Sequence, residues 1–210
     1  MQRNPTSGGL SNSESGGRGA PQESSSGKIR PAEIQQGNAP DFAKLPSCGD
    51  FDMRIARDGT WFYRGSPIGR KPLVKLFSTV LRRENGEYWL VTPVERGRIL
   101  VDDAPFVAVE VETEGESSDR RLVFRTNVDD RVTADREHPI RVDHDPASGG
   151  PVPYVTVRNG LEARILRSVY YHLVELGDLL EIKGTEQFGV WSAGEFFPLG
   201  PVEDAGDAAQ

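Results

Sequence analysis

The chain has 210 residues, of which 36% are apolar and 27% charged, and its formal net charge is −7. This composition is typical of a globular protein, and the acidic balance argues against general, charge-driven binding to DNA, which needs a basic surface. The single cysteine, Cys48, excludes an intramolecular disulfide and a cysteine-based zinc site. No stretch has the roughly 18 apolar residues of a membrane span and no apolar signal-peptide core opens the chain, so we expect a cytoplasmic protein without a membrane partner.

The two ends of the chain differ in composition from its middle. Residues 1–38 are rich in serine and glycine, with few large apolar side chains. Such a stretch cannot bury enough surface to offset the entropy of ordering, so we expect a disordered tail. We expect a second, acidic tail over 202–210. Between them we expect an N-terminal α+β domain over 39–105 and a C-terminal domain over 106–201.

The segment FDMRIARDGTWFYRG predicts a β-hairpin. Apolar residues alternate on both sides of Asp58-Gly59, a pair that favours a tight turn. A two-residue loop would pair Ile55 with Phe62 and turn both toward the core. The outer face of the hairpin would then carry Arg54, Trp61 and Tyr63.

Two later segments have the periodicity of helices. After Pro72, apolar residues recur from Leu73 to Leu81 at helical spacing, and a proline is tolerated in a first helical turn. The segment LEARILRSVYYHLVEL, residues 161–176, shows the same spacing, with Asn159 or Gly160 as its cap. The other apolar segments indicate short strands, mostly in hairpins. Together these elements predict an α+β fold.

The surroundings of the two predicted helices resemble each other. A shift of 93 residues aligns Trp61 with Tyr154 and Leu73 with Leu166, within units that each read strand, bend, helix, strand. The two units share the pattern of apolar positions but hardly any identical residues. The pattern alone leaves internal duplication and coincidence both open.

Three long segments carry a family resemblance: DGTWFYRGSPIGRKPLVKLF, YWLVTPVERGRILVDDAPF and PYVTVRNGLEARILRSVYYHLVE. Together they resemble a bacterial domain-of-unknown-function family, number 1285, over roughly residues 40–200. The resemblance implies two structurally related domains, the second like a partly open pleckstrin-homology barrel. It also implies a ligand site at their interface and a signalling role with a nucleotide-like or nucleic-acid ligand. No chemistry is established for the family, so no catalytic residue follows from it.

The predicted outer face of the hairpin is the first candidate site. Aromatic rings beside a guanidinium can stack a base, each stack contributing about 1–3 kcal/mol. The alternative is that another part of the domain covers these rings.

The start of the first predicted helix is the second candidate. Its cations lie where free N–H groups and the helix dipole favour an anion. Arg164 would hold a related position on the second helix, and the two sets would then face one cleft. The cations of the first set are Arg64, Arg70, Lys71 and Lys75. No Walker pattern accompanies them.

Acidic residues and histidines offer weaker candidates. Asp102 and Asp103 are adjacent, and adjacent residues of a strand face opposite ways, so we expect salt bridges or a turn there, with Arg96 or Arg98 as partners. The segment EHPIRVDHDP fits no metal-binding motif. We therefore expect no metal, no cofactor and no catalytic residue.

Three functions remain in order of preference. The first is a non-enzymatic sensor that binds an anionic, nucleotide-like or nucleic-acid ligand between the two domains. Arg54, Arg64, Arg70, Lys71 and Arg164 would hold phosphate, and Trp61 or Tyr63 would stack on the base. The second is an adaptor whose C-terminal domain binds a protein partner. The third is a hydrolase-type enzyme with an unrecognised site.

Overall fold

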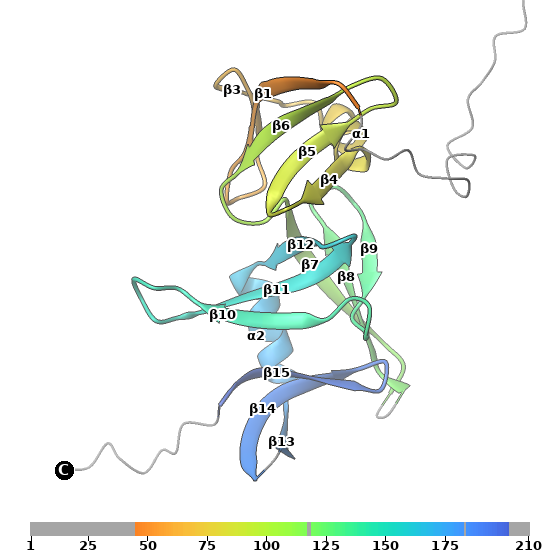
Figure 1. Ribbon diagram of the computed structural model, residues 1–210. Helices are drawn as coiled ribbons and strands as arrows, with labels where there is room; N and C mark the ends of the chain where they lie inside the picture. Colours follow the sequence, from red (N-terminus) through yellow and green to blue (C-terminus); the bar gives the residue numbers. More distant parts are fainter. Residues whose placement is uncertain (1–44, 117–118, 183, 202–210) are drawn as a thin grey trace, which may run out of the picture. The chain divides into compact units, whose positions relative to one another are not determined.

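The computed structural model describes residues 45–116, 119–182 and 184–201. The expected tails, 1–38 and 202–210, lie outside these residues. The described part forms three sheets and two helices, so the protein is mostly β rather than an even mixture of helix and strand (Figure 1). The strands read from the sequence are present, but each helix is only 9 residues long. No helix among the described residues is long and apolar enough to cross a membrane.

Sheet A contains the first six strands, in the order β3-β2-β1-β6-β5-β4. Helix α1 begins just before Pro72, as expected, and packs Val74 and Phe77 against the core. The elements are β1 (Ser47–Ile55), β2 (Trp61–Tyr63), β3 (Ser66–Pro67), α1 (Lys71–Thr79), β4 (Leu81–Glu84), β5 (Glu87–Val91) and β6 (Arg96–Val101).

Sheet B follows, in the order β10-β11-β12-β7-β8-β9, and sheet C closes the described chain as β13-β14-β15. Helix α2 lies between the strands of sheet B and those of sheet C (Figure 1). The elements of sheet B are β7 (Phe106–Glu114), β8 (Arg121–Thr126), β9 (Arg131–Thr133), β10 (Ile140–His144), β11 (Pro151–Arg158) and β12 (Leu161–Ile165). The remaining elements are α2 (Arg167–Glu175), β13 (Asp178–Ile182), β14 (Thr185–Ser192) and β15 (Glu195–Pro201).

Sheets A and B share one strand order. Each consists of two three-stranded antiparallel meanders, joined where the first strand of the first meander runs parallel to the last strand of the second. Those parallel pairs are β1 with β6 and β7 with β12. The helices differ, because α1 lies between the meanders of sheet A whereas α2 follows the second meander of sheet B. The 93-residue shift aligns α1 with α2, two helices at different places in the strand order. The shift therefore does not align the equivalent strands of sheets A and B.

The register of the β1–β2 hairpin differs by one residue from the expectation. Ile55 pairs with Trp61 instead of Phe62, because the loop extends from Ala56 to Thr60 and the Ala56 N–H bonds the Thr60 carbonyl at 2.9 Å. A shift of one residue reverses the faces of a strand. Trp61 therefore lies in the core, only 1% exposed, and is not on the outer surface.

The second helix is shorter than expected. Residues 161–165 form strand β12, and α2 begins at Arg167. The β12 segment alternates buried and half-buried side chains, which is the period of a strand, and it pairs with both β11 and β7. Sheet pairing on both edges outweighs the helical spacing of the sequence. Arg164 thus lies on a strand and not on a helix.

One hydrophobic core joins the three sheets. Among its fully buried side chains are Trp61 from sheet A, Phe106 and Phe124 from sheet B, and Val190 from sheet C. The Trp61 and Phe77 rings stack with centroids 6.2 Å apart, which fixes α1 against sheet A. Sheet A and α1 therefore share one packed core with sheets B and C.

Candidate functional site

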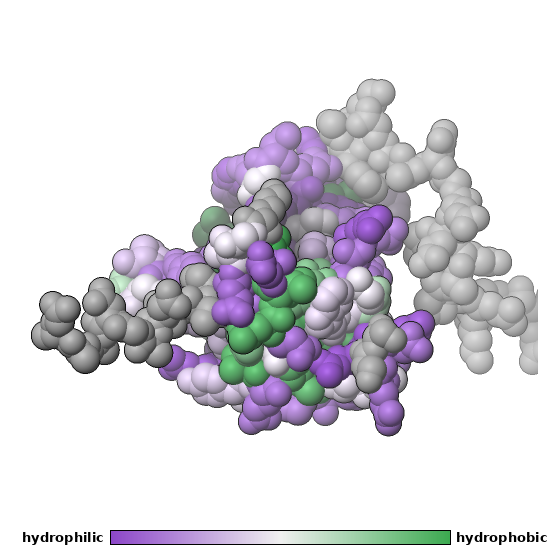
Figure 2. All heavy atoms as spheres, turned by 90° about the horizontal axis from the view of Figure 1, so that it is seen from below, coloured by the Kyte–Doolittle hydropathy of each residue, from purple (hydrophilic) through white to green (hydrophobic). Residues whose placement is uncertain are grey.

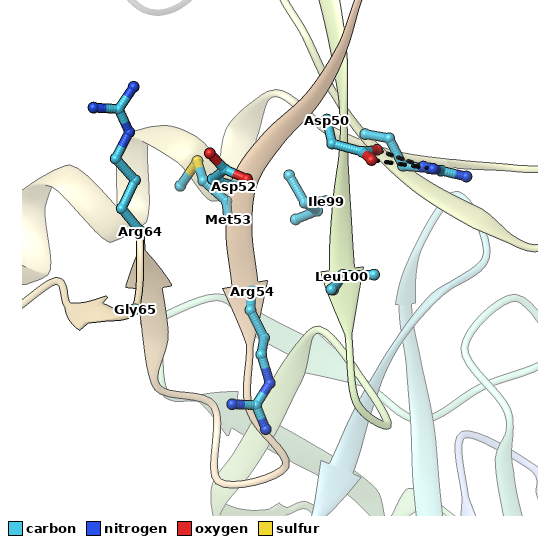
Figure 3. A pocket seen from close by; sticks show the side chains of 9 residues that line it. Asp50, Asp52, Met53, Arg54, Arg64, Gly65, Ile99 and Leu100 are labelled. Carbon is cyan, nitrogen blue, oxygen red and sulfur yellow. Dashed lines mark hydrogen bonds and ion pairs between the residues drawn. The ribbon is translucent and has the colours of Figure 1, made fainter.

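A pocket of about 420 Å³ opens on sheet A at the junction of β1 and β6. The pairing of these strands shifts register between Asp50 and Arg54, so the strand is locally irregular there. Apolar side chains alternate with charged ones around it (Figure 3). The lining residues are Asp50, Asp52, Met53, Arg54, Arg64, Gly65, Arg98, Ile99 and Leu100. Two of the cations proposed from the sequence, Arg54 and Arg64, therefore belong to one pocket.

Arg54 is held by a carboxylate at the end of β6. Its Nε and Nη2 atoms donate to the two oxygens of Asp102 at 2.8 and 2.5 Å. These hydrogen bonds hold the pKa of Asp102 below its ordinary value, so the carboxylate stays ionised. The expectation that Asp102 forms a salt bridge is confirmed, although its partner is Arg54 rather than Arg96 or Arg98. A ligand anion would have to compete with this carboxylate for Arg54.

Arg98 is likewise neutralised. It donates to Asp50 at 2.7 and 3.2 Å and to Glu87 at 2.8 Å. Hydrogen bonding to Arg98 lowers the pKa of Asp50. Arg98 and its two carboxylates thus form a closed cross-strand cluster at one side of the pocket.

Arg64 differs from both. Within the described residues it has no ion pair, and its guanidinium lies over the Tyr63 ring at 5.2 Å from the centroid. Its backbone φ is 48°, and its N–H bonds the Asp52 carbonyl at 2.9 Å, which fixes the turn at the rim of the pocket. The guanidinium extends away from β1, in the opposite direction from that of Arg54 (Figure 3). Arg64 is therefore a charged side chain at the pocket that no carboxylate of the described residues pairs with.

Tyr63 remains available for stacking, whereas Trp61 does not. Tyr63 is 46% exposed at the end of β2, beside Arg64. Trp61 is enclosed by the core, and its Nε1 has no hydrogen-bond partner among the described residues. Of the aromatic residues proposed to stack on a base, only Tyr63 can be reached by a ligand.

The cations at the start of α1 contact sheet B. The Lys71 and Lys75 ammonium groups donate to the two oxygens of Asp129 at 2.8 and 3.1 Å. The hydrogen bond from Lys71 makes the largest contribution to lowering the pKa of Asp129, and the hydrogen bond from Lys75 the next largest. Arg70 precedes the helix, is exposed, and has no ion pair within the described ranges. The expected anion site at this helix start is therefore filled in part by a carboxylate of the protein itself.

Arg164 is also engaged. It donates to Asp103 at 2.6 Å, and the Tyr154 hydroxyl donates to the same carboxylate at 2.6 Å. Burial is the main cause, and the hydrogen bond to Asp103 the second, that raises the pKa of Tyr154 to about 12. Arg164 and Lys71 each hold a different carboxylate and do not gather with Arg64 around one pocket.

Asp50, Asp52, Arg98 and Leu100 are among the lining residues that the sequence did not indicate as site residues. They are brought together by the parallel pairing of β1 with β6, two strands separated in the chain by a whole helix and four other strands. A motif search along the chain gives no signal for such a pairing. Among the residues that the structure describes, no three His, Cys, Asp or Glu side chains gather as a metal site.

Family profiles match nearly the whole described chain. The profile of the DUF1285 N-terminal domain, a domain of unknown function, matches residues 43–104, and that of the DUF1285 C-terminal domain matches residues 105–199. The chain belongs to the DUF1285 family. The family indicated by the sequence is thereby confirmed, and the two profiles divide the chain between sheets A and B. No curated protein matches the chain.

Two solved structures of DUF1285 proteins resemble the chain. One, from Silicibacter pomeroyi DSS-3, is 50% identical, with a TM-score of 0.71 over 81% of this chain and 92% of its own. The other, from Shewanella baltica OS155, is 27% identical, with a TM-score of 0.47 over 59% of this chain and 90% of its own. The first relative extends over nearly the same two domains.

Proposed function

We propose that this DUF1285 protein is a non-enzymatic, cytoplasmic sensor that binds an anionic, nucleotide-like ligand at the pocket of sheet A. The observation that carries the proposal is Arg64, a guanidinium without an ion pair in the described chain at the rim of a pocket of about 420 Å³. A phosphate satisfies such a group with charge-assisted hydrogen bonds. The volume lies within the usual range of small-molecule sites.

Tyr63, which lies beside Arg64 next to the pocket, and two of the lining residues fit the remaining parts of a nucleotide. Tyr63 offers an exposed ring for a base, while Leu100, 66% exposed, offers an apolar wall. Asp52 has no ion pair among the described residues and can accept hydrogen bonds from ribose hydroxyls or amino groups. In this proposal the ligand lies on the first domain, because Lys71 and Arg164 are already bound to Asp129 and Asp103.

The shared strand order of sheets A and B also supports a proposal that the two domains arose by duplication. The pleckstrin-homology-like character of the second domain stays a prediction.

The test is a thermal-shift and calorimetry panel at low salt with nucleoside mono-, di- and triphosphates, inorganic pyrophosphate, unphosphorylated nucleosides and a short oligonucleotide. A true ligand at 100 times its Kd should stabilise the fold by about 2.7 kcal/mol, which raises Tm by several degrees. Nucleosides without phosphate should have no effect, because Arg64 would have nothing to bind.

A matched pair of variants localises the binding. Arg64→Glu should abolish the shift, since it reverses the charge at the pocket. Arg167→Glu is the control, because Arg167 also lies over an exposed tyrosine, Tyr171, at 5.9 Å but on α2. Absence of any shift with the whole panel, or equal loss in both variants, would show the proposal to be wrong. Turnover of a bound nucleotide that depends on Asp52 would instead make the protein an enzyme.

A further inference from the structure

Two charged side chains of the sheet A pocket have no charged partner among the described residues. Asp50, Arg54 and Arg98 are already engaged by the hydrogen bonds described above. Asp52 and Arg64 differ, because within the described ranges neither makes an ion pair or a side-chain hydrogen bond. In Figure 3 no dashed line reaches either of them. The pocket therefore offers a ligand one carboxylate and one guanidinium.

The backbone holds Asp52 and Arg64 beside each other. The Arg64 N–H donates to the Asp52 carbonyl at 2.9 Å, next to the register pair of Met53 with Tyr63. Side chains that face each other across paired strands start about 5 Å apart. Both side chains lie toward the same end of β1 in Figure 3, whereas Arg54 lies toward the other end. A ligand that contacts both must carry hydrogen-bond donors close to its anionic group.

In a nucleotide, the donors nearest to the phosphate are the hydroxyls of the sugar. The 2′- and 3′-hydroxyls lie on the sugar that carries the 5′-phosphate, whereas the donors of the base lie beyond the glycosidic bond. A carboxylate accepts hydrogen bonds at two oxygens, so it can hold both hydroxyls at once. Acidic side chains bind ribose hydroxyls in this way in dinucleotide-binding folds. The short distance between Asp52 and Arg64 thus favours the ribose hydroxyls over an amino group of the base.

We propose that Asp52 selects the sugar of the ligand and that the pocket takes a free ribonucleoside 5′-phosphate. Arg64 binds the phosphate, and the Asp52 carboxylate accepts hydrogen bonds from the 2′- and 3′-hydroxyls. A 2′-deoxynucleotide leaves one carboxylate oxygen without its partner, and a site built for two hydroxyls discriminates against such a ligand. This inference rests on the proposed function and narrows its ligand from nucleotides in general to ribonucleotides with both hydroxyls free.

A polynucleotide does not fit this pair of side chains. Inside an RNA strand every 3′-hydroxyl is esterified, and DNA lacks the 2′-hydroxyl throughout. The formal net charge of −7 opposes a polyanion as well, since binding to nucleic acid depends on a basic surface. The ligand is therefore a mononucleotide rather than a nucleic acid.

The test uses the full chain in calorimetric titrations at low salt with nucleotides that differ in their sugar. The probes are the 5′-monophosphates of adenosine and guanosine, the 2′-deoxy and 3′-deoxy forms of each, and a ribotrinucleotide with a phosphorylated 3′ end. Each ribonucleotide should bind roughly tenfold more tightly than either of its deoxy forms, because each deoxy form lacks one hydrogen bond to a charged group. The trinucleotide, which has no free pair of hydroxyls, should bind as weakly as the deoxy forms.

Asp52→Asn assigns the preference to one side chain. Asparagine tolerates the positive φ of 49° at this position, so the variant should keep the local fold. Its neutral amide has one acceptor oxygen, so the ratio of ribonucleotide to 2′-deoxynucleotide affinity should fall to about threefold or less.

A carboxylate of sheet C provides the matched control. Sheet C lies on the side of the molecule where apolar side chains gather in one area (Figure 2), and none of its residues lines the pocket. Glu181→Gln, which removes an exposed carboxylate of this sheet, should therefore leave the ratio unchanged.

The outcomes separate this inference from the proposed function. Equal affinities for ribonucleotides and 2′-deoxynucleotides, abolished for both by Arg64→Glu, would overturn the role of Asp52 and leave the nucleotide site in place. A ribose preference that persists in Asp52→Asn, or tight binding of the trinucleotide, would also overturn it. Absence of binding by every probe would overturn the proposed function, and this inference with it.

Discussion

The two sides of sheet A use similar residues in opposite ways. On the side of α1, Trp61 is enclosed, and the cations Lys71 and Lys75 are bound to Asp129 of sheet B. Next to the pocket on β1 and β6, the side chain of Arg64 lies over the ring of Tyr63 and has no ion pair among the described residues. In the sequence these aromatic and basic residues form one continuous cluster. A basic residue near the boundary between two sheets can stabilise their contact by pairing with a carboxylate of the other sheet. A basic residue without such an ion pair is the better candidate for binding a ligand anion.

Replacement of Trp61 should have the largest effect on stability. Trp61→Ala removes a fully buried ring and its stacking on Phe77, so we expect the free energy of unfolding to fall by about 3–5 kcal/mol in urea denaturation. Trp61→Phe should cost less, since Nε1 makes no hydrogen bond with the described residues. Tyr63→Ala, on the exposed end of the same strand, is the control. Similar losses for Trp61→Ala and Tyr63→Ala would remove the distinction between the two sides.

Replacement of Gly59 should disturb the contact between the hairpin loop and sheet B. Its φ is +82°, and an added Cβ would lie 2.5 Å from Asn127 Nδ2 and 2.9 Å from Val107 Cγ2. Gly59→Ala should therefore destabilise the fold by about 1–3 kcal/mol. Gly86→Ala is the matched control, because φ is +83° there but no atom lies within 4 Å of the added Cβ. Equal costs at both positions would mean that the Asn127 contact contributes nothing.

Arg158 fastens sheet B to α1. It donates to Asp130 and, at 2.9 Å, to the Ser78 carbonyl, and it lies over the Phe106 ring at 4.8 Å. Because this arginine is partly buried, Arg158→Ala should lower the free energy of unfolding by about 1–3 kcal/mol. The exposed pair of Arg131 with Glu112 provides the comparison, and Arg131→Ala should cost much less, because solvent screens an exposed ion pair. Chemical denaturation of both variants measures the difference, which would be absent if Arg158 were only a surface charge.

The bond of Asp129 to Lys71 and Lys75 should give the smallest effect, visible as a dependence on pH. The pKa of Asp129 is lowered from 3.8 in the folded chain. Its contribution is therefore fully present above about pH 3.8 and is lost as the pH falls through the lower, folded-state value. Tm measured from pH 6 to pH 2 should fall less steeply for Asp129→Asn than for the parent chain. Parallel curves for the two proteins would show that this ion pair does not stabilise the interface.

Much of the local structure follows from the sequence. The first helix could be predicted because Pro72 and the apolar spacing from Leu73 onward both favour it, and α1 begins as expected. The second helix was predicted too long because the apolar residues of 161–165 fit both the spacing of a helix and the alternation of a strand. Local spacing cannot reveal that this segment lies between β11 and β7, where pairing on both edges favours a strand.

The candidate site was predicted in part. Arg54 was proposed on the outer face of the hairpin and Arg64 among the cations before the first helix, and both line the pocket. Trp61 was predicted on the wrong face because the sequence around Asp58-Gly59 does not distinguish a five-residue loop from a two-residue loop. A shift of one residue in the pairing reverses which side chains of a strand face the core. Asp52 and Leu100 were not recognised, since their neighbours across the β1–β6 pair are distant in the chain.

The sequence by itself determined the family, the strand-rich core and the clustering of cations before α1, because these depend on residue type and short-range spacing. The tertiary structure alone decided which cations stay free. Whether an arginine has a carboxylate beside it depends on strand pairing and sheet contacts between residues far apart in the chain. Among the residues that the structure describes, Asp102 therefore neutralises Arg54 and Asp129 neutralises Lys71, while Arg64 lies at the pocket without an ion pair.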